Sequence, residues 1–310
     1  MDKDTFQSLI DELMRFYNQR DYAGALALVE QKAGLFPEQI ARTTFWRMCL
    51  LSLCNRPGEV LSVFQQGLDA GLWWVESQFR DPDLDAVRGL PEFKELAAES
   101  HRKCMEARKH IEPDRTLLVP DDTSRELPLL IALHGRNGHK DSNLEHWEIA
   151  RRRGWLVLSP QSRQAIYQGA YCWDDNEQGL TDILFHVEET MKAYGVDRTR
   201  IVTAGFSQGS GMAIYAALSG RIGARGFIGV GTFMAEPECL IALARQARSV
   251  RGYFITGEKD HTLEKARAIQ KILKEHHIQF GEEVHAGLGH EFPADFGRSF
   301  ENALRFILEA

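Results

Sequence analysis

The spacing of hydrophobic positions changes once along the chain, near residue 115. Before that point, apolar residues recur every three or four positions, the spacing that places them on one face of a helix. After it, short apolar runs alternate with amphipathic helical stretches. Such alternation is typical of strand–helix–strand units and of a mostly parallel sheet whose strands are buried on both faces. We therefore expect a helical region followed by an α/β domain.

The spacing of apolar residues in the helical region predicts helices in pairs, with breaks at residues 18–21 and 55–57. Tyr22 and Ala25 at the start of the second helix, and Pro37 at its end, resemble the pattern of tetratricopeptide repeats. The resemblance implies a surface for a protein partner or for self-association. A helical cap packed on the following domain is the alternative. We assign residues 1–105 to a tetratricopeptide-like helical domain with its linker helix, and 106–310 to the second domain.

In the second domain, each short apolar run that is bounded by turn residues predicts a strand. These runs cover residues 116–120, 127–133, 155–160, 201–204, 226–231, 251–257 and 280–285. Helical periodicity marks residues 175–194, 212–218, 263–276 and 294–308. The long segment 161–174 falls after a strand and carries Tyr167, Tyr171 and Trp173. We expect it to wall a pocket, with packing beneath the loop as the alternative.

Composition excludes several function classes. The formal net charge is −7 and no large Lys/Arg cluster occurs, which argues against a nucleic-acid partner. No apolar run reaches the roughly 18 residues of a membrane span, and the first residues lack the apolar core of a signal peptide. The five cysteines form no Cys-x-x-Cys pair, so we expect free thiols in a cytoplasmic protein. No metal or cofactor motif is present in the sequence.

The stretch from Ile201 to Gly211 combines a β-branched strand, a Gly-x-Ser-x-Gly turn and a helix-forming run. This context suits a nucleophile elbow, in which Ser207 sits on a sharp strand-to-helix turn. Gly205 and Gly209 flank the serine where a Cβ would clash. By itself the pentapeptide is a weak signal, and a glycine-rich turn is the alternative.

Residues just past the predicted strand ends supply partners for the serine, since these ends share one edge of a parallel sheet. His290, in a glycine-flanked loop, is the candidate base, and Asp260 the candidate acid that orients it. A solvated loop histidine and a helix N-cap are the respective alternatives, and Glu258 is a second candidate acid. The order Ser, Asp, His is the one found in α/β-hydrolases.

The loop after residue 133 is expected to complete an oxyanion hole. The backbone N–H of Arg136, or of Gly135, would join that of Gln208 at the start of the helix after the serine. The side chain of Arg136 either meets an anionic substrate or faces solvent. The remaining predicted substrate contacts are His134, Tyr171, Trp173, Phe233 and Met234.

Residues 115–310 resemble the phospholipase/carboxylesterase branch of the α/β-hydrolases, which includes the acyl-protein thioesterases. The likeness is carried by the segment 133–135 with Gly138, the motif at 205–209, Asp260, and Gly289 with His290. The chain departs from this branch at Ser210, where the branch usually has glycine, and in its N-terminal helices, which the thioesterases lack. The resemblance implies an α/β-hydrolase fold with a mostly parallel sheet.

The sequence as a whole predicts a cytoplasmic serine hydrolase that cleaves small-molecule carboxylic esters through an acyl-enzyme, without metal or cofactor. A thioesterase and a peptidase of the prolyl-oligopeptidase type are the alternatives within the same chemistry. An inert hydrolase domain in a partner-binding scaffold is the alternative of another class.

Overall fold

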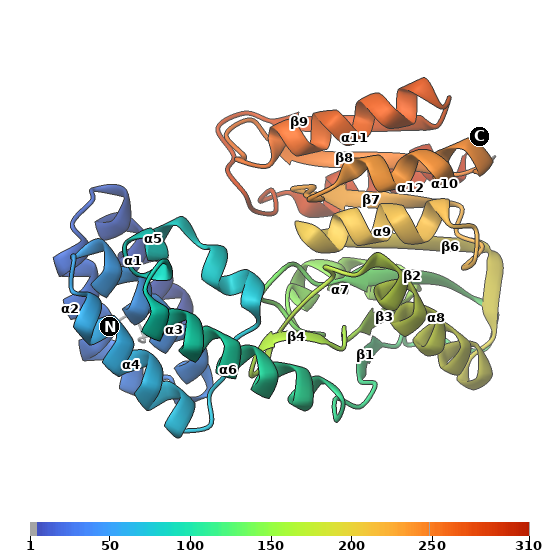
Figure 1. The fold of residues 1–310 in the computed structure, drawn as a ribbon. Coiled ribbons are helices and arrows are strands. Elements are labelled where there is room, and N and C mark those ends of the chain that lie inside the picture. Colours follow the sequence, from blue (N-terminus) through green and yellow to red (C-terminus); the bar gives the residue numbers. More distant parts are fainter. Residues whose placement is uncertain (1–4, 248, 310) are drawn as a thin grey trace. The chain divides into compact units, whose positions relative to one another are not determined.

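The structure, a computed structural model, describes residues 5–247 and 249–309. The chain divides into two compact units, Met1–Ile111 with Ala165–Ala170, and Glu112–Gln164 with Tyr171–Ala310. We call them the helical unit and the α/β unit. Figure 1 labels their helices and strands.

The helical unit is built from helices that pack on their neighbours in sequence, α1 on α2, α2 on α3 and α3 on α4. Local signals start them: Thr5 and Ser8 form a capping box at α1, and the Asp21 side chain accepts the N–H of Gly24 at α2. The helices are α1 (Phe6–Asn18), α2 (Tyr22–Lys32), α3 (Ile40–Leu53), α4 (Pro57–Asp69), α5 (Asp85–Arg88) and α6 (Pro91–Arg108). Short 3-10 turns cover Ala33–Leu35, Pro37–Gln39, Glu76–Arg80 and Pro82–Leu84.

Residues 165–170 complete the helical unit from much later in the sequence. The Ile166 carbonyl accepts the N–H of Val75 at 2.8 Å, and the Ala165 carbonyl accepts Nε–H of Arg108 at 2.8 Å. Tyr167 is buried and forms an isolated bridge with Trp74. The expected pocket wall is therefore wrong for Tyr167, because this apolar stretch satisfies its backbone within the helical unit.

The α/β unit contains a seven-stranded sheet of order β1-β3-β2-β6-β7-β8-β9. Strand β1 runs antiparallel to β3, and the other neighbouring pairs are parallel. Its strands are β1 (Arg115–Leu118), β2 (Leu127–Leu133), β3 (Leu156–Pro160), β6 (Val196–Phe206), β7 (Gly226–Val230), β8 (Arg251–Gly257) and β9 (Gln279–His285). The short strands β4 (Gln164–Tyr167) and β5 (Ala170–Cys172) pair separately.

Helices cover both faces of the sheet (Figure 1). One apolar cluster joins the strands to α8 (Asn176–Ala193), α9 (Gln208–Leu218), α10 (Leu240–Gln246) and α11 (Leu263–Glu275). A second cluster on the opposite face includes residues of α7 (Leu144–Arg152) and α12 (Phe296–Leu308). A last 3-10 turn covers Pro237–Cys239. A mostly parallel sheet between two helical layers, preceded by a helical region, confirms the predicted fold class.

The strands that matter for chemistry end at one edge of this sheet. Strands β2, β6, β7, β8 and β9 are parallel neighbours, so their carboxyl ends open on the same side. In sheets of this kind that side is where ligands bind, because loops from several strands converge there.

Candidate active site

Ser207 occupies a strained turn between β6 and α9. Its backbone has φ 55° and ψ −123°, a region that residues other than glycine rarely adopt. Its N–H donates to the Val230 carbonyl at 2.9 Å, and its carbonyl accepts the N–H of Phe233 at 3.1 Å. The end of β7 thereby holds the turn on both sides. Backbone strain fixed in this way is characteristic of functional positions.

The two glycines of the motif bring three backbone segments together. A Cβ on Gly205 would lie 2.3 Å from the carbonyl carbon and oxygen of Gly209. A Cβ on Gly209 would in turn lie 2.3 Å from the carbonyl oxygen of His134. Real Cβ atoms do not approach backbone this closely, so only glycine fits at either position. The turn therefore packs directly on the loop that follows β2.

Ser207, His290 and Asp260 form one hydrogen-bonded line. The Ser207 Oγ lies 2.9 Å from Nε2 of His290, and Nδ1 of His290 lies 2.9 Å from Oδ1 of Asp260. The serine follows β6, the aspartate follows β8 and the histidine follows β9. A carboxylate accepts only, so Nδ1 carries the ring proton and Nε2 is left to accept the proton of the serine.

The environment of this line favours a neutral imidazole at His290. The Asp260 side chain is fully buried, while that of His290 is 21% exposed. Asp260 Oδ1 also accepts the N–H and the Oγ–H of Thr262, each at 2.7 Å. Burial lowers the pKa of His290, and the hydrogen bond with Asp260 opposes part of that shift. A neutral imidazole held this way can accept a proton near neutral pH.

Two supports of this line were not predicted from the sequence. Thr262 fixes the carboxylate from two residues further along the chain. Phe206 packs its ring 4.7 Å from that of His290 and 5.1 Å from that of Phe292. Both residues stand beside predicted site positions, so a search for hydroxyl or aromatic neighbours of Asp260 and Ser207 could have found them.

The backbone groups predicted for the oxyanion hole lie next to Ser207. Gln208 begins α9, so its N–H has no acceptor within the helix and adds to the positive end of the helix dipole. A Cβ on Gly135 would lie 3.4 Å from Cβ of Ser207, which brings the loop after β2 against the turn. The start of α9 and this loop thus border the same space beside the serine.

The side chains of Gln208 and Arg136 are tied to each other through Asp174. Gln208 Oε1 accepts the N–H of Trp173 at 3.1 Å, and its Nε2 donates to Asp174 Oδ1 at 2.8 Å. Arg136 NH1 donates to the same oxygen at 2.6 Å. Arg136 is 30% exposed and this carboxylate engages it, so it does not simply face solvent. Asp174 links the two segments whose N–H groups border the serine, a contact that the sequence analysis did not predict.

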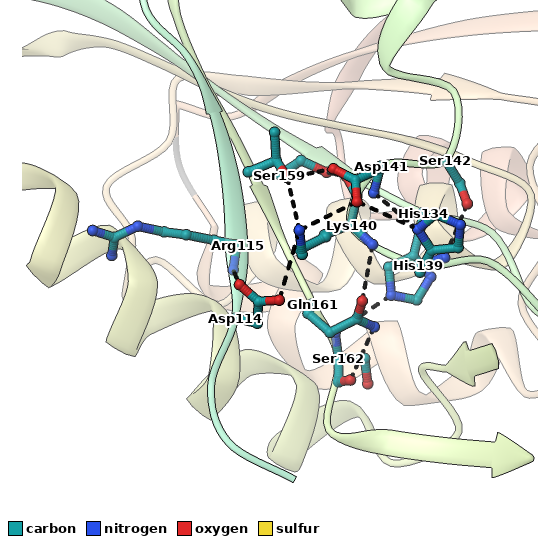
Figure 2. A network of polar contacts seen from close by, with 11 residues as sticks. Asp114, Arg115, His134, His139, Lys140, Asp141, Ser142, Ser159, Gln161 and Ser162 are labelled. Carbon is teal, nitrogen blue, oxygen red and sulfur yellow. Dashed lines mark hydrogen bonds and ion pairs between the residues drawn. The ribbon is translucent and has the colours of Figure 1, made fainter. Parts of the chain in front are cut away.

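A polar network holds the rest of the loop after β2, as Figure 2 shows. The backbone N–H of Lys140 donates to Gln161 Oε1 at 3.0 Å, and its carbonyl accepts the Ser159 hydroxyl at 2.6 Å. The Lys140 ammonium lies 3.2 Å from Asp141 and 3.6 Å from Asp114. Contacts from Asp114 just before β1, from β3 and from the segment that follows β3 therefore fix this loop.

His134 and Trp173 are buried beneath the loop, a position that favours structural support over the predicted contact with substrate. The His134 side chain has Nδ1 2.9 Å from the Gly135 carbonyl, while its Nε2 accepts the N–H of Ser162 at 3.4 Å. Trp173 is 2% exposed and donates its Nε1–H to the His134 carbonyl at 2.8 Å. Both side chains use their polar atoms inside the protein and support the backbone of the loop.

The other three predicted contacts divide between surface and core. Tyr171 and Phe233 are half-buried, and their contact with substrate stays a prediction. Met234 is 6% exposed, belongs to the core cluster and lies 3.6 Å from Cys239 through its sulfur. Its burial and its contact with Cys239 favour packing over substrate contact.

Known proteins share this architecture. An uncharacterized protein from Bacillus cereus is 22% identical, covers 98% of this chain and 99% of its own, and has a TM-score of 0.56. Est1E from Butyrivibrio proteoclasticus is 19% identical, covers 64% of this chain and 94% of its own, and has a TM-score of 0.52. Likeness at this level of identity shows the fold, which is that of an α/β-hydrolase.

Sequence comparison finds relatives for part of the chain. Residues 173–308 match the family model described as phospholipase/carboxylesterase. A bifunctional acetylxylan esterase/xylanase from Neocallimastix patriciarum is 32% identical over 113 residues, 34% of this chain. The matched stretch spans 16% of the length of that relative. The predicted resemblance of the α/β unit to the phospholipase/carboxylesterase branch is thus confirmed. Among the described residues, no helix is both long and apolar enough to cross a membrane.

Proposed function

We propose that the protein is a serine hydrolase that cleaves carboxylic esters through an acyl-enzyme intermediate. The observation that carries the proposal is the line of Ser207, His290 and Asp260, with 2.9 Å between hydroxyl and imidazole and 2.9 Å between imidazole and carboxylate. A serine hydroxyl is a weak nucleophile unless a base adjoins it, and here the base is itself oriented by a buried acid. The family match of residues 173–308 supports the same chemistry.

In this mechanism the Ser207 oxygen attacks the ester carbonyl while His290 Nε2 takes its proton. Asp260 stabilises the imidazolium that forms. The N–H groups of Gln208 and of Gly135 or Arg136 stabilise the negative charge on the former carbonyl oxygen. His290 then returns the proton to the departing alcohol, which leaves an acyl group on Ser207. Water, activated by His290, attacks the acyl-enzyme, and the acid is released as the proton returns to the serine.

The test is the initial rate of hydrolysis across p-nitrophenyl esters of increasing acyl length, with Ser207→Ala as the blank. A rate that depends on Ser207 supports the proposal, and the acyl length at the maximum sizes the pocket. Ester, thioester and amide versions of the preferred acyl group then separate an esterase from a thioesterase or a peptidase. Failure of wild type to react with a fluorophosphonate probe would favour the inert-scaffold alternative.

The helical unit is the proposed site of contact with a protein partner or with a second copy of the chain. Its large apolar side chains Met14, Leu35, Ile40 and Met105 are each more than 40% exposed. Light scattering on the purified chain distinguishes self-association from a monomer. The five cysteines are all free thiols, which supports the proposal of a cytoplasmic protein.

We expect kcat/KM to rise with pH and to level off, because His290 must be neutral to accept the serine proton. Burial lowers the pKa of His290, so the midpoint should fall below the ordinary histidine value of 6.5. The measurement is kcat/KM for one ester from about pH 5 to about pH 8. A flat profile, or a midpoint clearly above 6.5, would contradict the role of His290 as the base.

Acid unfolding must be separated from this titration. Burial lowers the pKa of His134 and of His186 to about 4 in the folded chain. The unfolded chain therefore binds more protons below the ordinary value of 6.5, and stability falls as the pH drops from there toward 4. Circular dichroism at each pH shows whether the chain is still folded where the rate declines.

We expect Asp174→Asn to lower kcat by about tenfold and to change KM little, because a misplaced oxyanion donor acts on the transition state. The substitution removes the charge that holds the Arg136 guanidinium and weakens the acceptor for Gln208. Glu188→Gln, which removes the same charge from an exposed position on α8, is the control and should leave kcat unchanged. Equal effects of both substitutions would show that Asp174 acts only through net charge.

A further inference from the structure

A second imidazole adjoins the proposed catalytic line and has no part in the mechanism above. His261 follows Asp260 directly in sequence, and its ring centroid lies 4.5 Å from that of His290. Its Nδ1 lies 3.9 Å from Asp260 Oδ1, and its side chain is 75% exposed. One ligand atom from each of Asp260, His261 and His290 can be chosen so that all three lie within 4.8 Å of one another. Two imidazoles and a carboxylate thus converge at one point.

The spacing of these atoms suits a tetrahedral metal ion. Zn²⁺ binds imidazole nitrogen and carboxylate oxygen at about 2.0 to 2.1 Å, which places neighbouring ligand atoms about 3.3 Å apart. The distances from Asp260 Oδ1 to His290 Nδ1 and to His261 Nδ1 are 2.9 Å and 3.9 Å, one on each side of that value. The third pair, a ring nitrogen of His261 and one of His290, lies within 4.8 Å, so rotations of the two rings would bring the three ligands toward zinc spacing.

The surroundings meet the other requirements of a zinc site. Thr262 holds Asp260 Oδ1 through its N–H and its hydroxyl, the kind of support that orients a ligating carboxylate. The exposure of His261 gives an ion in solution direct access to the cluster. Three protein ligands leave the fourth tetrahedral position to water, as in open zinc sites.

We propose that Asp260, His261 and His290 bind Zn²⁺ and that the bound ion reversibly inhibits the hydrolase. Zinc takes the lone pair of Nδ1, so the single proton of the neutral His290 ring moves from Nδ1 to Nε2 through solvent. Nε2 then carries a proton and no longer accepts one from Ser207. The ion also replaces the hydrogen bond between His290 and Asp260. Inhibition rests on the proposed function, whereas zinc binding does not.

The decisive experiment is a calorimetric titration of the full-length protein with zinc chloride. We expect one site in wild type and an affinity at least about tenfold weaker in His261→Ala and in His261→Asn, since each removes a ligand. Magnesium chloride should give no binding, because Mg²⁺ prefers oxygen ligands. His110→Ala is the matched control: it removes an exposed imidazole 3.5 Å from the carboxylate of Glu106, and should leave the zinc affinity unchanged.

Ester hydrolysis supplies the second reading. In wild type, the rate with zinc divided by the rate without it should fall, and it should recover on addition of EDTA. In the His261 variants the same fall should require higher zinc concentrations. No zinc binding, or equal affinity in wild type and both His261 variants, would overturn the site. Binding at His261 without any loss of rate in an active enzyme would overturn the inhibition. Binding at His261 in a protein that turns over no ester would leave the site standing and contradict the proposed function instead.

Discussion

Replacing Ser207 with alanine is expected to lower kcat by about 10⁵- to 10⁶-fold while the chain stays folded. The hydroxyl is the proposed nucleophile, and its Oγ is the atom that lies 2.9 Å from His290 Nε2. His290→Ala should have an effect of similar size, because a serine without its base is as inactive as a base without its serine. The double variant should then be no slower than either single variant, since the residues act as a unit.

Ser210→Ala is the matched control for this experiment. It deletes a hydroxyl three residues further along the chain, in α9, where Ser210 Oγ lies 2.7 Å from Thr232 Oγ1. We expect a modest loss of stability of about 1 kcal/mol and most of the turnover retained. Turnover in Ser207→Ala comparable to wild type would remove Ser207 from the mechanism. Effects of Ser207→Ala and His290→Ala that multiply in the double variant would show that the two residues act independently.

The parts of the fold that could be predicted from sequence are those whose strands are buried on both faces. The predicted strands 127–133 and 251–257 have the bounds of β2 and β8. Strand β6 begins at Val196, earlier than the predicted residue 201, because residues 198–200 are exposed, carry no apolar pattern and lie at a register shift between the paired Val196 and Ile201. Hydrophobic periodicity reports burial, so it finds the buried half of a strand and misses the exposed half.

In the candidate site, too, some residues could be predicted from the sequence pattern and others could not. Ser207, Asp260 and His290 could be selected from the sequence because each follows a predicted strand at the carboxyl edge of a parallel sheet. The tie between Arg136 and Asp174 could not, since it joins two loops whose side-chain directions have no periodic signal. The direction of the His134 side chain has no periodic signal either, because the residue after a buried strand can point into a cavity or under the loop, and here it points under the loop.

No pattern in the sequence indicates that residues 165–170 belong to the helical unit while their neighbours in sequence belong to the α/β unit. The segment is mostly apolar and runs into the aromatic residues Tyr171 and Trp173, which fits a pocket wall and a packed strand equally well. Its backbone partners, such as Val75, lie some ninety positions earlier in the sequence. Pairing over such a distance depends on which unit offers unsatisfied backbone groups, and a single sequence does not carry that information.

Replacing Gly209 with alanine is expected to damage stability and turnover together. The added Cβ would lie 2.3 Å from the His134 carbonyl oxygen and 2.5 Å from that of Leu133, both of them backbone atoms at the end of β2 that cannot rotate away. Relief requires the start of α9 and the loop after β2 to move apart. Such overpacking costs about 3 kcal/mol, which corresponds to a melting temperature lower by roughly 6 to 12 °C.

The same movement separates the two groups of N–H donors that border Ser207, so kcat should fall by about 10²-fold in the molecules that remain folded. Gly297→Ala is the matched control, because this glycine also lies in a helix of the α/β unit and its added Cβ would make ordinary contacts at 3.8 Å with Ile149. It should keep full turnover and a melting temperature at or slightly above that of wild type, since alanine favours the helix. Thermal unfolding by circular dichroism, with kcat measured well below the transition, separates the two effects. A Gly209→Ala variant as stable and as active as Gly297→Ala would mean that the turn at Ser207 and the loop after β2 are not packed as tightly as their backbone distances indicate.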